Sequence, residues 1–290
     1  MSKIAFIGLG VMGFPMAGHL AAAGHDVTVY NRTASKAARW IAEHNGCAAP
    51  SPRAAAAGAE FVFSCVGNDD DLREVLTGPQ GALPAMQAGA VHVDHSTTSA
   101  QVARELASVF ERAGTDFVDA PVSGGQAGAE KGMLTVMCGG SEAAFARAKP
   151  VIEAYARAVA LMGPSGAGQL TKMVNQICVA GVLQGLAEGL ALGQRAGLDM
   201  AAVLDVISKG AAQSWQMEHR GATMCEGRYD FGFAVDWMRK DLGIVQDEAA
   251  RLGLELPLTR LIDGYYAEVQ GIGGGRWDTS SLIERLRRQG

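Results

Sequence analysis

A glycine-rich turn near the N-terminus constrains the fold of this chain more than any other feature. The segment Gly8-Leu9-Gly10-Val11-Met12-Gly13 follows an apolar run at residues 4–7 and precedes a helical pattern that places Met16 and Leu20 on one face. In such a turn the first glycine permits a tight bend, the second lets a pyrophosphate approach the backbone, and the third lets the helix pack on the strand. The pattern therefore predicts a dinucleotide-binding unit, with phosphates over the positive end of the helix.

The first part of the chain, up to about residue 162, alternates short apolar runs with helical patterns. We predict strands at residues 4–7, 27–30, 61–66, 91–94, 117–119, 134–138 and 158–161. We predict helices between them at residues 12–23, 34–43, 72–76, 100–113 and 142–155. Strands interleaved with helices indicate crossover connections and a largely parallel sheet that is covered on both faces.

Beyond Gly163-Pro164 the strand pattern stops and only helical patterns remain. A long helix is expected from about residue 168 to 196, followed by shorter helices near 200–209, 234–252 and 259–269. The predicted fold class is α/β: an N-terminal Rossmann domain over residues 1–164 is followed by an all-α C-terminal domain over residues 165–290, joined by the long helix.

Glycine is used nearly twice as often as the ordinary frequency of about 7%, with 38 among 290 residues. Part of the excess lies in the long helix, where Gly181, Gly185, Gly189 and Gly193 recur every four residues and form one stripe. Each glycine costs the helix about 1 kcal/mol relative to alanine. The stripe therefore predicts a close approach by another helix, from the same chain or from another subunit.

Composition excludes several classes of protein. With 25 basic and 30 acidic side chains, the chain has no global positive field for nucleic acid or an anionic membrane. Its five cysteines are scattered and form no C-x-x-C pair, and no signal peptide is visible. The longest apolar stretch, residues 174–192, carries Asn175, Gln176, Gln184 and Glu188, which a membrane span disfavours. We expect a soluble, cytoplasmic protein.

The end of the predicted second strand bears on the choice of cofactor. Proteins that bind NAD place Asp or Glu here to grip the ribose 2′-OH, but this chain has Asn31-Arg32-Thr33, with Lys36 one turn later. A guanidinium can pair with a 2′-phosphate, so Arg32 predicts a preference for NADP(H) over NAD(H). The alternative is that Arg32 is an ordinary solvated arginine on a surface loop.

Taken together, the motifs resemble those of the β-hydroxyacid dehydrogenase family, in matching order through nearly the whole chain. Residues 6–17 (FIGLGVMGFPMA) are similar to its cofactor signature and residues 119–125 (DAPVSGG) to its substrate-binding signature. Residues 166–175 (GAGQLTKMVN) are similar to its catalytic signature, and residues 240–242 (KDL) to a later cofactor-contacting element. Gln176 departs from the family pattern, which often carries a second Asn there.

The resemblance assigns roles to two groups of residues. It implies that Lys172 is the general acid/base and that Asn175 positions the lysine and the substrate; their spacing of three residues puts them on one helix face. It also implies that the loop Ser123, Gly124 and Gly125 binds the substrate carboxylate, which suits a hydroxyl beside exposed backbone amides. A cleft between the two domains is the expected place for the substrate.

The residues expected to bind the cofactor fall into two sets. The turn and the second strand supply Gly8, Gly10, Val11, Met12, Gly13, Asn31, Arg32, Thr33 and Lys36. The resemblance adds Val66, Gly67, Ser96, Thr97, Phe233 and Lys240. No metal site is expected, because His92 and His95 fall on opposite sides of a strand and no cysteine cluster accompanies them.

The function predicted from these features is an NADP(H)-dependent oxidoreductase. It would interconvert a small semialdehyde or 2-oxo acid (succinic semialdehyde, glyoxylate, tartronate semialdehyde or methylmalonate semialdehyde) and its hydroxy acid. The alternatives are a 3-hydroxyisobutyrate or serine-type 3-hydroxy acid dehydrogenase that works oxidatively, an imine reductase, and a non-catalytic NADP-sensing protein. Imine reductases generally lack a lysine at the position of Lys172. A homodimer or homotetramer through the helical domain is expected, with no nucleic-acid or membrane partner.

Overall fold

The computed structural model describes residues 1–288 of the chain. They form two compact units, one comprising Met1–Lys172 and the other beginning at Met173. The predicted α/β class is confirmed: a parallel-sheet Rossmann unit comes first and a helical unit follows. The long helix α8 (Ala167–Arg195) begins in the first unit and supplies the first helix of the second.

Among the described residues, nine strands form one sheet in the order β3-β2-β1-β4-β5-β6-β8-β7, with β9 paired to β8. The pairs from β3 to β6 are parallel, whereas β8 runs antiparallel to β6 and β7 and parallel to β9. The strands are β1 (Lys3–Ile7), β2 (Asp26–Tyr30), β3 (Cys47–Ala48), β4 (Phe61–Ser64), β5 (Val91–Asp94), β6 (Asp116–Asp119), β7 (Val122–Ser123), β8 (Leu134–Gly139) and β9 (Ala156–Gly163).

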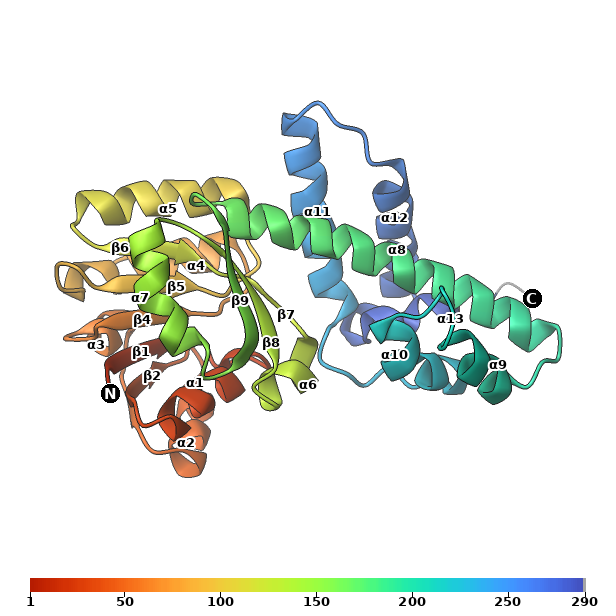
Figure 1. Ribbon diagram of the computed structural model, residues 1–290, viewed down its shortest axis with the longest axis horizontal. Helices are drawn as coiled ribbons and strands as arrows, with labels where there is room; N and C mark the ends of the chain where they lie inside the picture. The colour runs from red at the N-terminus through yellow and green to blue at the C-terminus, as the bar shows by residue number, and fades with distance from the viewer. Residues whose placement is uncertain (289–290) are drawn as a thin grey trace. The chain divides into compact units, whose positions relative to one another are not determined.

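Helices cover both faces of this sheet (Figure 1). They are α1 (Gly13–Ala22), α2 (Ala34–Glu43), α3 (Pro52–Ala56), α4 (Asp69–Thr77), α5 (Ala100–Arg112), α6 (Gly125–Glu130), α7 (Glu142–Ile152) and the short 3-10 turn η1 (Leu83–Ala85). Alternate residues of β1 enter two different cores. Ile4 and Phe6 pack with residues of α1, α2 and α7, and Ala5 and Ile7 pack with residues of α3, α4 and α5. A strand buried on both faces explains why its sequence is continuously apolar.

The predicted strands and longer helices of this unit are present, with differences at their ends and among the shortest elements. The strands β3 and β7 and the helices α3 and α6 were not predicted, because segments of two to six residues carry little periodicity. Helix α4 starts at Asp69, before the predicted residue 72, because the Asn68 side chain accepts a hydrogen bond from the Asp71 N–H and caps the helix. Three consecutive carboxylates then occupy its first turn.

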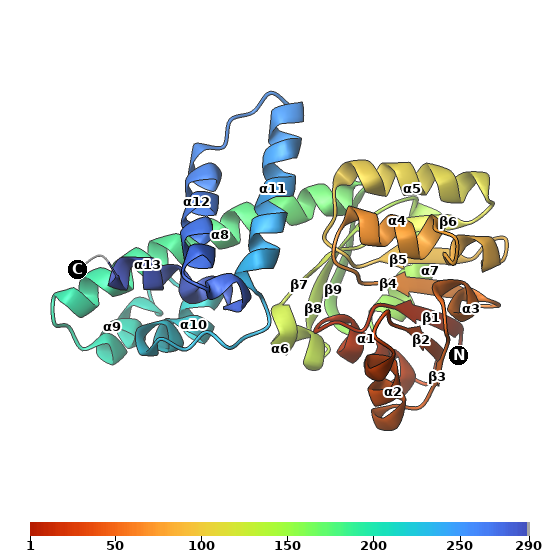
Figure 2. The ribbon, with the colours of Figure 1, turned by 180° about the vertical axis from the view of Figure 1, so that it is seen from behind.

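The second unit is helical throughout its described elements. They are most of α8, then α9 (Met200–Ile207), α10 (Trp215–Glu226), α11 (Val235–Arg251), α12 (Pro257–Gly271), two 3-10 turns, η2 (Gly274–Arg276) and η3 (Thr279–Leu282), and α13 (Ile283–Arg287). Helices α11 and α12 lie side by side (Figure 2). Helix α10 was not predicted. The Ser214 hydroxyl caps its start, and Gly227, at φ 73°, ends it. One apolar core joins α8, α10, α11, α12 and α13.

The glycine stripe of α8 is only partly covered by its own chain. A side chain at Gly181 would meet Leu258 at 4.0 Å, and one at Gly193 would lie 2.8 Å from the Met200 sulfur. At Gly185 and Gly189 an added Cβ would meet nothing within 4 Å among the described residues. Of the two alternatives for the partner, a helix of the same chain is therefore excluded at the middle of the stripe among residues 1–288.

Helix α8 is also long and apolar enough to cross a membrane by length and composition. That criterion is weak for a single helix, because the core helix of a soluble protein satisfies it equally. Here Leu183, Ala187 and Leu190 are buried in the core of the second unit, which accounts for the apolar composition of the helix.

Candidate active site

The turn between β1 and α1 has the geometry that the glycine motif predicts. Gly8 has φ 100°, and a side chain there would place its Cβ 2.3 Å from the Cys65 carbonyl oxygen. A Cβ on Gly13 would lie 2.0 Å from the Gly8 carbonyl oxygen, whereas a Cβ on Gly10 would meet nothing within 4 Å. Two of the glycines are therefore required by packing, and the third leaves open space beside the backbone. This cradle fits the pyrophosphate of a dinucleotide.

The end of β2 is tied to this turn by Asn31. Its side-chain oxygen accepts a hydrogen bond from the Leu9 N–H at 2.8 Å, and its amide nitrogen donates to the Thr33 carbonyl at 3.1 Å. The structure thus brings the first two predicted cofactor segments together. Thr33 and Lys36 are exposed beside them.

Arg32 is largely solvent-exposed, with 84% of its side chain accessible. Its Nη1 lies 3.0 Å from Asp71 Oδ1, at the start of α4. Sequence reasoning missed Asp71, although three consecutive aspartates at residues 69–71 were visible as a charge run. An exposed ion pair of this kind contributes at most about 1 kcal/mol. The guanidinium is therefore weakly held where the motif predicts a 2′-phosphate.

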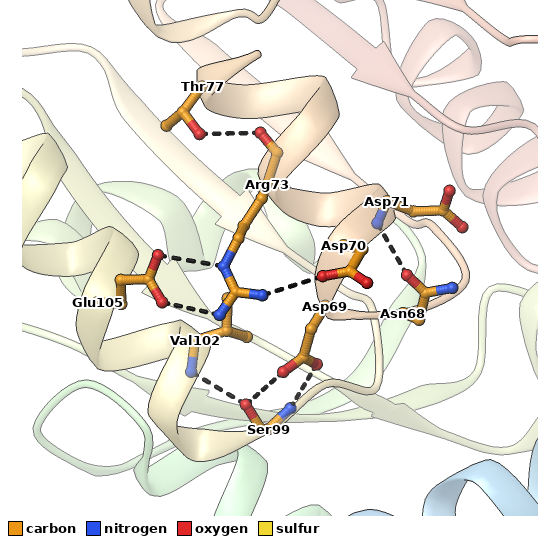
Figure 3. Close-up of polar contacts among 9 residues, drawn as sticks. All are labelled: Asn68, Asp69, Asp70, Asp71, Arg73, Thr77, Ser99, Val102 and Glu105. Atoms are coloured by element: carbon orange, nitrogen blue, oxygen red, sulfur yellow. Dashed lines mark hydrogen bonds and ion pairs between the residues drawn. The ribbon is translucent and has the colours of Figure 1, made fainter.

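The loops after β4 and β5 carry the next predicted cofactor residues and are joined to each other. The Val66 N–H donates to Ser96 Oγ at 2.9 Å. A second contact joins helices α4 and α5: Asp69 accepts hydrogen bonds from both the N–H and the hydroxyl of Ser99, the residue that caps α5 (Figure 3). Arg73 of α4 donates to both carboxylate oxygens of Glu105 of α5. These contacts fix the backbone on which Val66–Gly67 and Ser96–Thr97 lie.

A buried carboxyl group, Asp94, supports the β5 loop from inside the sheet. Its Oδ1 accepts hydrogen bonds from the Ser64 hydroxyl at 2.7 Å and from the Ser96 N–H at 3.0 Å. Burial raises the pKa of Asp94 to about 7, although these hydrogen bonds favour the carboxylate. Burial lowers the pKa of the neighbouring His92 to about 3. His92 contacts Ser64, whereas His95 contacts the Ala120 carbonyl and the Tyr155 hydroxyl.

The start of α8 is fixed to the sheet by Asp119, at the end of β6. Asp119 Oδ1 accepts from the Gly166 N–H at 2.7 Å and Oδ2 accepts from the Gln169 N–H at 3.0 Å. Burial raises the pKa of Asp119 to about 6, against these backbone hydrogen bonds, which favour the ionised form. Gly168 lies between them, and a Cβ there would be 2.4 Å from the Met137 carbonyl oxygen. Close packing on the sheet therefore explains Gly168 of the catalytic signature, whereas Gly166 has φ 91°, a conformation that favours glycine.

The side chain of Gln169 adds a second attachment. Its Nε2 donates to the Ser96 carbonyl at 2.8 Å, and its Oε1 accepts from the Thr98 N–H at 3.1 Å. The nitrogen and the oxygen of the glutamine amide both hold α8 against the loop that carries two predicted cofactor residues, Ser96 and Thr97. The sequence analysis includes Asp119 in the substrate-binding signature and Gln169 in the catalytic signature but gives neither an individual role, because nothing in their local patterns identifies such distant partners.

Lys172 follows Gln169 by three residues and is 7% exposed. Asn175 is half-buried three residues further along the same helix, on the face that the spacing predicts. In the second unit, Gln176 and Asp241 connect Asn175 to Lys240 through hydrogen bonds and an ion pair. The structure thus connects a predicted substrate residue to a predicted cofactor residue. The connection runs through Gln176, noted in the sequence as a departure from the family pattern, and Asp241, which lies within the predicted cofactor-contacting element at residues 240–242.

The remaining predicted residues occupy separate places. Ser123 pairs with Thr135 in the β7–β8 ladder, and Gly124 and Gly125 follow at φ 130° and 61°, conformations that favour glycine. Phe233 precedes α11, and its carbonyl accepts from the Thr279 N–H at 2.9 Å. Within residues 1–288, no group of three or more His, Cys, Asp or Glu side chains is placed to hold a metal ion.

The chain is similar to known proteins over nearly its whole length. Residues 3–163 match the profile described as the NAD binding domain of 6-phosphogluconate dehydrogenase, and residues 166–286 match that described as the NAD-binding domain of NADP-dependent 3-hydroxyisobutyrate dehydrogenase. An uncharacterized oxidoreductase of Shewanella frigidimarina is 63% identical, with 99% of each chain covered. The 2-hydroxy-3-oxopropionate reductase of Escherichia coli is 34% identical, covering 98% of this chain and 97% of the relative.

The solved structures include a protein named Psf3 in complex with NADP+ and 2-OPP. It is 27% identical to this chain, with a TM-score of 0.89, and the match covers 98% of this chain and 99% of that one. The chain belongs to the β-hydroxyacid dehydrogenase family. This dehydrogenase is therefore an oxidoreductase that acts on CH–OH groups of small hydroxy acids and uses a nicotinamide cofactor.

The buried carboxyl group of this dehydrogenase gives a prediction about pH. A folded-state pKa of about 7 for Asp94, above the ordinary value of 3.8, means that its contribution to stability is present at low pH and is lost as pH rises towards 8. In Asp94→Asn that loss is absent. Between pH 5 and pH 8, the free energy of unfolding of the variant should therefore rise relative to the wild type by more than about 1 kcal/mol.

Urea unfolding at pH 5, 6, 7 and 8 measures this difference. Asp70→Asn is the matched control, because the Asp70 side chain is 95% exposed. The control should run parallel to the wild type. Parallel curves for Asp94→Asn as well would show that Asp94 does not titrate in this range.

Proposed function

We propose that this dehydrogenase interconverts a small semialdehyde or 2-oxo acid and its hydroxy acid with NADP(H), using Lys172 as the general acid/base. The observation that carries the proposal is the placement of Lys172. It is a buried lysine one turn after the point where Asp119 and Gln169 fix α8 to the sheet. Burying an ammonium group is costly, so the position is unfavourable for a lysine with a purely structural role.

When bound, a nicotinamide cofactor supplies or accepts the hydride at the carbon of the substrate. In the reducing direction Lys172 Nζ donates a proton to the oxygen of the former carbonyl, and the product is an alcohol. In the oxidising direction the neutral amine of Lys172 takes that proton from the hydroxyl group. Asn175, on the same face of α8, holds the lysine and the substrate oxygen in register.

The proposed anion loop indicates that the substrate carries a carboxylate. The Ser123 hydroxyl and the backbone amides of Gly124 and Gly125 suit one carboxylate. Succinic semialdehyde, glyoxylate, tartronate semialdehyde and methylmalonate semialdehyde all carry such a group. The name of the Escherichia coli relative, a 2-hydroxy-3-oxopropionate reductase, supports this substrate class.

Oxidation of 3-hydroxyisobutyrate or a serine-type 3-hydroxy acid is the second candidate direction, and the match to a 3-hydroxyisobutyrate dehydrogenase profile favours it. Lys172 argues against an imine reductase and against a protein that only senses NADP. An assay of NADPH absorbance with semialdehydes, glyoxylate and imines, and of NADP+ with 3-hydroxy acids, distinguishes these functions. Turnover of imines alone, or of none of these compounds, would contradict the proposal.

The role of Lys172 is tested by Lys172→Ala. General acid/base groups contribute about 100-fold to 10,000-fold to rate, so kcat should fall by that factor, while the Kd for NADPH changes little. Steady-state kinetics and NADPH fluorescence titration measure the two quantities. Lys209→Ala is the control, because Lys209 is an exposed residue two positions beyond the end of α9 and is paired with Asp205. A near-normal kcat in Lys172→Ala would overturn the assignment.

The preference for NADP(H) rests on Arg32 and on the absence of a carboxylate from residues 31–33. The weak pairing of Arg32 with Asp71 supports this proposal, because a 2′-phosphate would replace a surface ion pair with a charge-assisted, bidentate one. Asp71 thus competes with the cofactor for the same guanidinium.

Two variants test the cofactor preference in opposite directions. Arg32→Asp should lower the ratio of kcat/KM for NADPH to that for NADH by about ten-fold to a hundred-fold, because the variant loses a hydrogen-bonded charge pair with the 2′-phosphate. Asp71→Asn should raise the same ratio by up to about five-fold, because it removes the competing carboxylate. A wild-type preference for NADH, or a ratio unchanged in Arg32→Asp, would contradict the proposal.

A homodimer or homotetramer formed through the helical unit is proposed as the state of this protein. The open face of α8 supports it: Val174 and Val182 are exposed, and Gly185 and Gly189 have open space beside them. A smooth apolar face of this kind would let a helix of a second copy approach closely.

The cytoplasm is the proposed compartment, in keeping with five cysteines that form no disulfide.

Val182→Asp tests the assembly. A carboxylate at the centre of the proposed interface should convert an oligomer into a monomer of 30.2 kDa, because an unpaired charge would be buried there. Size-exclusion chromatography with light scattering measures the mass. Val206→Asp, at an exposed valine of α9, is the control and should leave the mass unchanged. A monomeric wild type, or an oligomer that survives Val182→Asp, would refute the proposed interface.

A further inference from the structure

A chain of hydrogen bonds links helices α8 and α11 within the second unit. Asn175 Nδ2 donates to Gln176 Oε1 at 2.8 Å, and Gln176 Nε2 donates to Asp241 Oδ2 at 2.6 Å. Lys240 Nζ lies 3.0 Å from the other carboxylate oxygen of Asp241. Gln176 and Asp241 are 1% and 4% exposed, so water does not compete for these contacts.

The chemistry of this chain fixes the orientation of each amide. An ionised carboxylate only accepts hydrogen bonds, so Gln176 must turn its NH2 group towards Asp241. The oxygen of the same amide then lies on its other branch and must accept, which it does from Asn175. The NH2 group of Asn175 is therefore turned towards Gln176, and its oxygen occupies the opposite branch. One buried carboxylate thus decides the direction of two successive amides.

We infer that Asp241, acting through Gln176, orients the Asn175 amide so that its oxygen faces the reacting groups. This inference rests on the proposed roles of Lys172 and Asn175. The groups that would meet this oxygen are donors: the ammonium of Lys172 and the hydroxyl of a hydroxy acid. An NH2 group in its place would oppose the ammonium and offer the hydroxyl no acceptor. Gln176 and Asp241 are positioning residues, and Asn175 is the residue that contacts substrate.

The pairing also explains the departure of residue 176 from the second Asn that resembling sequences often carry. The glutamine side chain reaches from α8 to α11, where its Nε2 donates to Asp241, and its Oε1 accepts a hydrogen bond from Asn175. The same carboxylate neutralises Lys240, a predicted cofactor residue on α11. Asp241 therefore positions two groups: the amide of Asn175, a predicted substrate residue, through Gln176, and the ammonium of Lys240, a predicted cofactor residue.

A double-mutant cycle tests whether Gln176 acts through Asn175. Gln176→Met keeps the length of the side chain and removes both hydrogen bonds. It should lower kcat by about ten-fold to a hundred-fold, with the Kd for NADPH nearly unchanged. In an Asn175→Ala background the same substitution should lower kcat no further, because the group it positions is gone. Additive losses in the cycle would overturn the inference.

Gln184→Met is the matched control on the same helix. Gln184 is also buried, and its Nε2 donates to Glu188 Oε1 at 2.6 Å. The variant therefore loses one hydrogen bond between an amide and a carboxylate, but this bond is not part of the series that leads to Asn175. We expect its kcat to equal that of the wild type. A loss equal to that of Gln176→Met would show that the effect is structural and would overturn the inference.

A measurement without substrate separates this inference from the proposed function. In the full-length protein labelled with 15N, the side-chain NH2 signals of Gln176 are identified by their absence from Gln176→Met. In Asp241→Asn the fixed direction is lost, so the signals of both Gln176 and Asn175 should shift. Unmoved Asn175 signals would refute the inference even in an active enzyme. If the wild type turns over no compound in the panel, the proposed function fails, and the NMR result still decides the orientation.

Discussion

The carboxylate of Asp119 holds the first amides of the long helix α8, and the geometry of the candidate site depends on that contact. A buried carboxylate is costly to desolvate, and the rise of its pKa to about 6 reflects this cost. Two backbone N–H groups at the positive end of α8 offset it, at 2.7 and 3.0 Å. Gln169 adds two hydrogen bonds to the β5 loop, so the helix begins at one defined place and angle on the sheet. Lys172 takes its position from that start.

Three buried carboxyl groups do related work in different surroundings. Asp119 is met by backbone amides, Asp94 by a hydroxyl and an amide, and Asp241 by an amide side chain and a lysine. In each case the carboxyl oxygens accept hydrogen bonds, so the neighbouring groups turn donors towards them. This is how the protein fixes loops and amide orientations near a site that must bind an anionic cofactor and an anionic substrate. The exposed pair of Arg32 and Asp71 contrasts with them, because solvent leaves its guanidinium available to a better partner.

Local sequence was enough to predict the local geometry of the candidate site where its residues are close along the chain. The β1–α1 turn is one, since the three glycines act on residues near them, and the spacing of Lys172 and Asn175 on one helix is another. The short elements β3, β7, α3 and α6 escaped prediction because they have too few residues to show a period. Helix α10 escaped because its pattern is weak, although Ser214 and Gly227 mark its two ends.

What the sequence determined by itself is the class of the fold, from the order of strand and helix patterns along the chain, and the cofactor motif, from three glycines within two turns of each other. The candidate acid/base, Lys172, came from the resemblance to a known family. What only the tertiary structure decided is which distant groups hold them. Asp119 and Gly166 are 47 positions apart, Gln176 and Asp241 are 65 apart, and Arg32 and Asp71 are 39 apart. Hydrogen bonds and ion pairs act over about 3 Å, and a sequence pattern contains no measure of which separated residues come that close. The emptiness beside Gly185 and Gly189 is likewise a property of the packed chain, since the same stripe of glycines is compatible with a covered or an open helix face.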